Sequence, residues 1–352
     1  MPDAVPARDD SVELPREFGP PIVAAVVRRS PEDFVVVEEL GFEPSADGEH
    51  DFLYVEKRGA NTAWVARQLA RVAGVAARDV GYAGLKDRHA VTRQWFSVRR
   101  PGRGGTDWQS AAIDGVAILD VTRNARKLRR GAHTGNRFRI ALRSDDIGAV
   151  GEQLRQRVAA IASAGVPNYY GEQRFGRGNA NLVLARQVFD GKRVKRDARS
   201  LALSAARSFL FNAILAERVR AGTWNRLLAG DVANLDGSGS VFPVDVVTPD
   251  LESRTASLDI HPTATLWGDG APLARQDAAV VEFGIANRYP ELASGLLRAR
   301  MDAASRALRM RVSEVSIDVE PQVAWLGFRL PRGAFATTVL AEIVDYESQS
   351  ST

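Results

Sequence analysis

The order of strand-like and helical patterns constrains the fold of this chain more than any single motif does. Strand-like apolar runs fill the first part of the 352 residues, helical spacing dominates the middle, and strand-like runs return near the end. Separate runs of strands and helices are typical of α+β proteins. We therefore predict one α+β domain that is interrupted by an inserted, mostly helical domain.

Within the second half of the chain, the pattern predicts individual elements less clearly. Helical spacing predicts helices at residues 201–219, 276–283 and 296–309, and residues 261–271 are rich in loop formers. Strand-like runs follow at residues 312–330. We expect a short final helix over residues 334–344 and a polar tail from Glu347 onward.

Composition limits the classes of protein that this chain can belong to. It has no cysteine, which excludes disulfides, iron–sulfur clusters and thiolate zinc sites and fits the cytoplasm. Its four histidines are scattered, so no metal is expected. No apolar run reaches the roughly 18 residues of a membrane helix. Residues 1–17 lack the pattern of a secretory signal and are interpreted as a disordered leader.

Residues 79–99 form the strongest candidate for a functional segment. A short apolar run leads to Gly84, and the polar stretch Leu85-Lys86-Asp87-Arg88-His89 follows it. A second strand-like run occupies residues 92–98. A polar loop between two strands often carries binding or catalytic residues. A solvated turn without any function would show the same pattern.

Basic residues concentrate in the next part of the chain. The net charge of +4 points weakly to an anionic partner, and five cations fall within residues 123–130. Such a run can neutralise phosphates, which makes these four residues RNA-binding candidates: Arg126, Lys127, Arg129 and Arg130. Residues 137–142 alternate arginine with apolar side chains, so one face of this strand could contact RNA. A charged, solvated turn is the alternative for the basic run.

Six motifs, in one order, resemble the TruD family of tRNA pseudouridine synthases. The segment from Gly84 to Gln94 is similar to the catalytic motif of that family. The other five lie at residues 31–36, 135–138, 167–176, 204–212 and 330–337. Tyr170 departs from the pattern, because many members have phenylalanine there, but both residues supply an aromatic ring.

This resemblance implies a fold and an activity. The fold is that of a pseudouridine synthase catalytic domain, a mixed β-sheet flanked by helices, with an inserted TRUD domain. We place the catalytic domain at residues 18–161 and 310–352, and the insertion at residues 162–309. The reaction is the isomerisation of uridine 13 in the D arm of tRNA to pseudouridine. No cofactor is expected because the reaction has no redox step, and the expected partner of this monomeric protein is tRNA.

The resemblance also assigns roles to single residues. Asp87 is the catalytic carboxylate, which could attack C1′ or remove the C2′ proton and act through a glycal. The expected substrate-binding residues are Phe34, Asn136 and Phe335, with Lys86 and Phe138 as further candidates. A flipped base is usually held by aromatic stacking and by hydrogen bonds to its edge.

Two other functions are compatible with the sequence. A non-catalytic tRNA-binding or RNA-chaperone protein could retain the fold, but a carboxylate at Asp87 would then oppose binding to a polyanion. A hydrolytic glycosidase usually requires two carboxylates beside the scissile bond. The loop supplies one, and a second could come from elsewhere in the chain.

Overall fold

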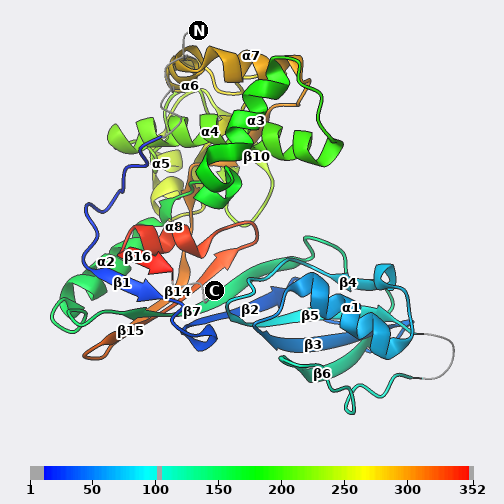
Figure 1. Ribbon diagram of the computed structural model, residues 1–352. Coiled ribbons are helices and arrows are strands. Elements are labelled where there is room, and N and C mark those ends of the chain that lie inside the picture. The colour runs from blue at the N-terminus through cyan, green and yellow to red at the C-terminus, as the bar shows by residue number, and fades with distance from the viewer. Residues whose placement is uncertain (1–11, 101–104, 349–352) are drawn as a thin grey trace, which may run out of the picture. The chain divides into compact units, whose positions relative to one another are not determined.

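The computed structural model describes residues 12–100 and 105–348 (Figure 1). Contacts divide the chain into two compact units. The sheet unit comprises Pro21–Ala162, Val312–Ala336 and residues 343–348, and the inserted unit comprises Ser163–Arg311, Thr337–Glu342 and residues 12–20. Residues 1–11 of the predicted leader lie outside the described residues. In its remaining part, the carbonyl oxygen of Pro15 accepts a hydrogen bond from the Tyr169 hydroxyl.

A large mixed sheet forms the sheet unit. Its main path runs in the order β14 (Ser313–Val319), β15 (Val323–Pro331), β7 (His133–Arg143), β2 (Phe34–Leu40), β5 (Val91–Arg99), β3 (His50–Arg58) and β6 (Val116–Asn124). Off this path lie β1 (Ala24–Val27), β4 (Val80–Tyr82) and β16 (Asp345–Ser348). The β2–β5 and β1–β16 pairs are parallel, whereas β7 and β15 pair antiparallel along nine residues of β15. Strands from both ends of the chain thus share one sheet.

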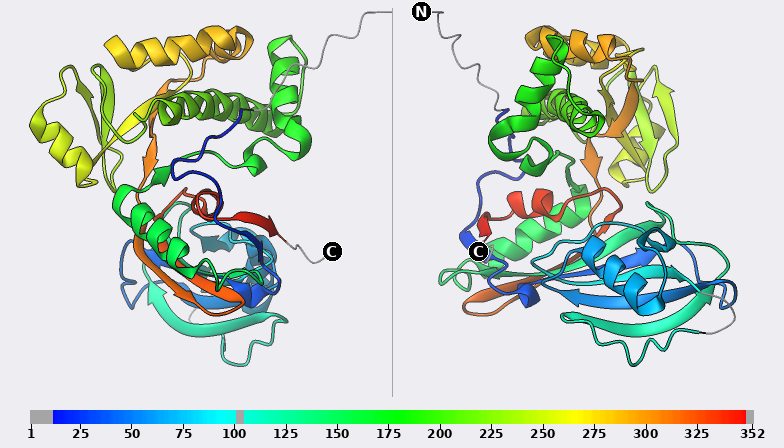
Figure 2. Two further views of the ribbon diagram at one scale, coloured as in Figure 1. Left: turned by 90° about the vertical axis from the view of Figure 1, so that its left-hand side faces the viewer. Right: turned by 45° about the vertical axis from the view of Figure 1, so that its right-hand side comes forward.

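Helices α1 (Thr62–Ala73) and α2 (Gly151–Ala164) pack against this sheet, α1 on the half that contains β3 and β5 and α2 near the end formed by β14 (Figure 2). Helix α1 packs Val65 and Leu69 against Leu53 of β3 and Phe96 of β5. Gly74 ends the helix in the left-handed conformation that glycine adopts readily. Helix α2 begins next to Val319 of β14 and also buries its apolar residues. The prediction of an α+β protein with a mixed sheet flanked by helices is confirmed.

The inserted unit combines helices with a smaller sheet. The helices are α3 (Ala180–Phe189), α4 (Arg196–Arg220), α5 (Pro249–Ala256), α6 (Gln276–Arg288), α7 (Pro290–Arg298) and α8 (Ala336–Ala341). The strands are β9 (Asp231–Leu235), β10 (Val241–Val244), β11 (Ile260–Leu266) and β12 (Ala304–Ala307), and β8 (Val166–Pro167) pairs with β13 (Arg309–Met310). Every residue of α4 from Phe209 to Ala216 is buried, as expected for a helix at the centre of its own core. Among the described residues, no helix has the length and apolar character to cross a membrane.

Three predicted elements of the second half are wrong. The helix predicted at residues 296–309 is instead the end of α7 followed by strand β12, and residues 261–266 of the predicted loop belong to β11. These two segments pair with each other, and such a partner overrides local propensity. The final helix α8 is shorter than predicted. Glu347 and Ser348 are not a free tail, because they pair with β1 in β16.

A buried ion pair joins α4 to the small sheet of the inserted unit. Arg218 donates two hydrogen bonds to Asp231, at 3.0 and 2.9 Å, and both side chains are almost inaccessible to water. Arg218 also donates to the carbonyl oxygens of Thr223 and Arg226, and Asp231 accepts from the Leu228 amide. The two charges therefore have hydrogen-bond partners that compensate for their removal from water.

Removing one member of this pair should destabilise the inserted unit. We expect Asp231→Ala to lower the free energy of unfolding by about 3–5 kcal/mol, because it leaves the Arg218 charge buried and unpaired. Urea unfolding measures this change. The control is Asp259→Ala, which breaks the exposed Arg254–Asp259 pair and should cost less than about 1 kcal/mol. Equal losses in the two variants would contradict the prediction.

Candidate active site

Asp87 lies in the loop that joins β4 to β5, two antiparallel neighbours in the sheet. Its carboxylate forms an ion pair with Arg28, with 2.9 Å between Nη2 and Oδ2, and accepts a hydrogen bond from the His89 amide at 3.0 Å. The Asp87 side chain is still 31% exposed. The carboxylate is thus oriented by two donors while it remains accessible to a substrate.

Three buried side chains hold the backbone of this loop. The Lys57 ammonium donates to the carbonyl oxygen of Asp87 at 2.6 Å. The Thr62 hydroxyl accepts from the Lys86 amide and donates to Gln94, whose amide group donates to the Gly84 carbonyl oxygen. Lys57, Thr62 and Gln94 come from β3, α1 and β5 and are buried. Three different elements therefore fix the position of the residues around Asp87.

Lys86 does not pair with Asp87. Its ammonium forms an ion pair with Glu38 of β2, and both side chains are buried. Burial raises the pKa of Glu38, while the Lys86 charge acts in the opposite direction. The substrate-binding role of Lys86 stays a prediction. Its ammonium already has Glu38 as a carboxylate partner. Glu38 was not predicted as a site residue, although two adjacent acids at the end of an apolar strand were a signal.

Three predicted substrate-binding residues share one face of the sheet. The antiparallel register places Phe34 opposite Ile140, Val36 opposite Phe138, and Glu38 opposite Asn136. The Phe34 and Phe138 rings meet edge to face at 6.2 Å between centroids, and the Arg28 guanidinium lies 4.0 Å from the Phe34 centroid. Arg28 therefore contacts both Asp87 and Phe34.

The other predicted substrate-binding residues differ in the contacts that they make within the protein. Asn136 is buried, and its Oδ1 atom has no hydrogen-bond partner among the described residues. Phe138 also stacks on Phe328 at 5.2 Å, so part of its surface is used in packing. Phe335 lies between β15 and α8, is 36% exposed, and does not take part in the contacts described for Asp87.

Positive charge surrounds Asp87 and affects nearby titratable groups. Burial lowers the pKa of Lys57 to about 8; the Asp87 carboxylate opposes this shift and the Lys86 charge adds to it. Burial, with the charges of Lys86 and Arg332, lowers the pKa of His133 to about 4, so its imidazole is neutral at pH 7. Within residues 12–100 and 105–348, no three His, Asp or Glu side chains form a group that could hold a metal ion.

The predicted basic run lies in the loop after β6 and packs beside β4. Leu128 is buried against Phe52 and Ala83, and a Cβ at Gly81 would come within 2.3 Å of the Leu128 carbonyl oxygen, so only glycine permits this approach. Lys127 donates to the Arg78 carbonyl oxygen, and Arg130 stacks on Tyr82. All five cations of the run are exposed: Arg123 at the end of β6, and Arg126, Lys127, Arg129 and Arg130 in the loop. The loop is therefore anchored while its charges face solvent.

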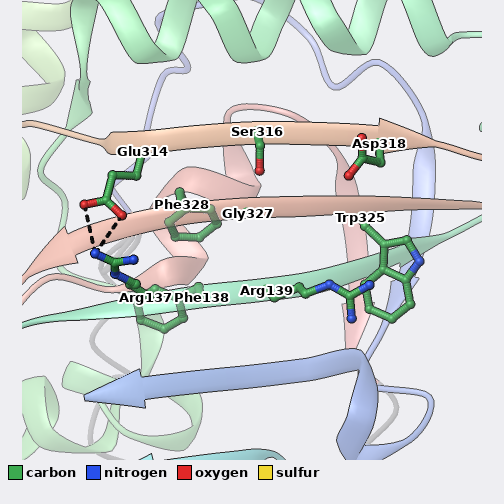
Figure 3. Close-up of a pocket in the computed structure, with 9 residues that line it drawn as sticks. All are labelled: Arg137, Phe138, Arg139, Glu314, Ser316, Asp318, Trp325, Gly327 and Phe328. Carbon is green, nitrogen blue, oxygen red and sulfur yellow. Dashed lines mark hydrogen bonds and ion pairs between the residues drawn. The ribbon is translucent and has the colours of Figure 1, made fainter. Parts of the chain in front are cut away.

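The arginine face of β7 is different, because its charges have partners within the protein (Figure 3). Arg137 forms ion pairs with Glu39 and Glu314, and the Arg139 guanidinium lies 3.7 Å from the Trp325 centroid. Both arginines line a shallow pocket of about 240 Å³. The RNA-contacting role of this face stays a prediction. The two glutamates make Arg137 less available to phosphates than the arginines of the loop after β6, whereas Arg139 has an aromatic partner alone in the contacts described.

Comparisons with known proteins cover nearly the whole chain. The family model described as tRNA pseudouridine synthase D (TruD) matches residues 20–192 and 191–343. A tRNA pseudouridine synthase D from Methylococcus capsulatus is 48% identical over 340 residues, which are 96% of each chain. Another from Aeromonas salmonicida is 47% identical over 330 residues, 94% of this chain and 93% of its own.

A solved structure agrees with these matches at the level of the fold. It is a candidate tRNA pseudouridine synthase D from Methanosarcina mazei, 20% identical, with a TM-score of 0.74 over 94% of this chain and 95% of its own. At that identity the likeness shows the fold alone, whereas the family model and the closer relatives carry the assignment. On these matches, the chain belongs to the TruD family of tRNA pseudouridine synthases.

Proposed function

We propose that this protein isomerises uridine 13 in the D arm of tRNA to pseudouridine, with Asp87 as the catalytic carboxylate and without a cofactor. The observation that carries the proposal is the setting of Asp87. Its carboxylate is accessible and paired with Arg28, while its backbone is fixed by Lys57. A rigidly placed group with one open side is suited to act on a bound nucleotide.

The chemistry of the isomerisation fits a single carboxylate. The C1′–N1 bond breaks, a C1′–C5 bond forms, and the proton lost from C5 is balanced by one gained at N1. No electrons are gained or lost overall, so no redox cofactor is required. Asp87 either attacks C1′ as a nucleophile or removes the C2′ proton to give a glycal, and both routes need it beside the ribose.

The neighbouring face of the sheet supplies groups that suit a uridine. A base buried in an RNA stack has to be flipped out before its glycosidic bond can be reached. Phe138 is partly exposed and offers aromatic surface, whereas Phe34 is buried (3% exposed) and supports the Phe138 ring edge to face. Asn136 has an unpaired amide oxygen that could accept from the uracil N3–H. Phe335, which is partly exposed, is proposed as a further contact.

Replacing the carboxylate should abolish the reaction and spare binding. We expect Asp87→Asn to reduce pseudouridine formation on an unmodified tRNA transcript by at least about 100-fold, because the amide can neither attack nor accept the proton. Its affinity for tRNA should be retained, since a carboxylate does not attract phosphate. Carbodiimide treatment followed by primer extension locates the product.

The outcomes of this assay separate the parts of the proposal. The exposed Asp120→Asn variant is the control and should keep the wild-type rate. A wild-type rate in Asp87→Asn would remove Asp87 from the mechanism. Pseudouridine at a position other than 13 would overturn the site assignment alone, and tRNA binding without any product would leave a non-catalytic binding protein.

Neutral variants of the loop after β6 should weaken tRNA binding and its salt dependence. We choose Arg126→Gln with Arg129→Gln, because neither guanidinium takes part in the contacts described for the loop. The slope of log K against log salt should become shallower by about 0.7–0.9 for each phosphate that the variant no longer neutralises. The matched control is Arg99→Gln with Arg137→Gln, because both of these exposed guanidinium groups are paired with glutamates. Equal slopes for the two pairs would identify the loop as a solvated turn.

The buried ammonium under the loop should make stability depend on alkaline pH. Folding lowers the pKa of Lys57 from 10.5 to about 8, so between these values the unfolded chain binds a proton that the folded protein has released. The free energy of unfolding of the wild type, relative to Lys57→Met, should therefore rise as the pH increases from about 8 to 10.5. Denaturation at several pH values measures the difference, and a flat difference would place this ammonium in contact with water.

A further inference from the structure

Three arginines gather around Tyr170 in the inserted unit. The Arg306 guanidinium lies 4.1 Å from the centroid of the Tyr170 ring, and that of Arg174 lies 5.0 Å from it. Arg174 also donates to the Ser204 hydroxyl of α4 at 3.1 Å. Ser204 and Arg207 are three residues apart on this helix, so their side chains are neighbours on one face.

The three arginines lie along one face of α4. Arg207 belongs to this helix, and Arg174 and Arg306 contact its side chains. Phe211, four residues after Arg207, lies on the same face of the helix, and its ring centroid is 5.4 Å from the Arg306 guanidinium. Arg207 donates to the carbonyl oxygens of Leu266 and of Asp302 in the segment before β12. The three cations therefore share one site, which we call the arginine cluster: Arg174, Arg207 and Arg306.

No member of the arginine cluster forms an ion pair with a carboxylate in the part of the chain that the structure describes. This sets them apart from Arg218 and Arg186 of the same unit, which pair with Asp231 and Glu291. The Nε atoms of Arg207 and Arg306 are buried, and neither has a hydrogen-bond acceptor among the described residues. Burial lowers the pKa of both guanidinium groups from their ordinary values.

Partly buried cations without a carboxylate partner are unfavourable, and the surrounding groups compensate for the lost hydration only in part. Arg306 makes a cation–π contact with Tyr170 and donates to the backbone carbonyl and the Oδ1 atom of Asn168, at 3.3 and 2.7 Å. Carbonyl oxygens bind Arg207. The backbone of Tyr170 is itself fixed, because its amide and carbonyl groups both bond to the buried side chain of Asn212. Positive charge is therefore concentrated in a fixed arrangement that an anion would complete.

We infer that the arginine cluster binds a phosphate group of the RNA substrate. Guanidinium groups match phosphate in geometry and retain their charge at every physiological pH. Arg174 and Arg207 are only half-buried, so solvent and ligands can approach them. The identity of the anion rests on the proposed function, in which tRNA is the substrate.

The test is the salt dependence of tRNA binding by Arg174→Gln, Arg207→Gln and the double variant. Each single variant should make the slope of log K against log salt shallower by about 0.7–0.9 if it leaves one phosphate without its cation. The control is Arg254→Gln in the same unit, which removes an equal charge from the exposed pair with Asp259 and should leave the slope unchanged. Wild-type slopes in all three variants would overturn the inference.

Folding of the variants is controlled separately from their binding. Thermal unfolding of each variant should match the wild type, and if the double variant melts early, the single variants decide the outcome. In addition, Arg306→Lys keeps the charge but loses the planar guanidinium, so it should weaken tRNA binding without a change in the number of cations. Wild-type affinity in Arg306→Lys would exclude Arg306 from the site.

Because binding is measured and not turnover, the inference and the proposed function can fail independently. Product at uridine 13 together with wild-type slopes in the variants would overturn the arginine cluster alone. Shallower slopes in a protein that forms no pseudouridine would overturn the proposed function and support the cluster. A wild-type protein that does not bind tRNA would overturn both.

Discussion

The loop that carries Asp87 depends on polar groups that are buried beneath it. Lys57, Thr62 and Gln94 are removed from water, which is unfavourable unless each finds a hydrogen-bond partner. The loop backbone supplies those partners, so the buried groups and the loop require each other. Because the three side chains come from β3, α1 and β5, the position of Asp87 is set by the packing of the sheet unit as a whole.

Local sequence patterns predicted the elements around this site but not the contacts between them. The strand–loop–strand pattern at residues 79–99 is present in the structure as β4, the loop that carries Asp87, and β5. Arg28, Glu38 and Lys57 were not identified, because each acts on the loop from 30 residues away or more. The local signal was Glu38 at the end of an apolar strand, and such a pattern does not predict which residue will pair with it.

Errors in the second half of the chain have the same origin. Residues 304–307 have alanine and arginine side chains that suit a helix, yet they form β12 because β11 provides a complementary edge. The polar residue Glu347 likewise pairs with Val26, which is far away in sequence. Helix α4 was predicted more reliably because a long helix that is apolar on several faces has few alternatives to central burial.

Arginine content alone does not distinguish these surfaces, because many of the arginines have a carboxylate or an aromatic ring as a partner and others do not. The net charge of +4 is small since acids offset most of the basic residues, and the sequence does not say which cations are offset. The structure separates Arg137 and Arg143, which pair with glutamate or aspartate, from Arg174 and Arg207, which do not. A phosphate has to compete with a carboxylate for an arginine that is already paired. It meets no such competition at an arginine without a carboxylate partner. The cations without carboxylate partners, and not the overall charge, therefore determine where a polyanion binds most favourably.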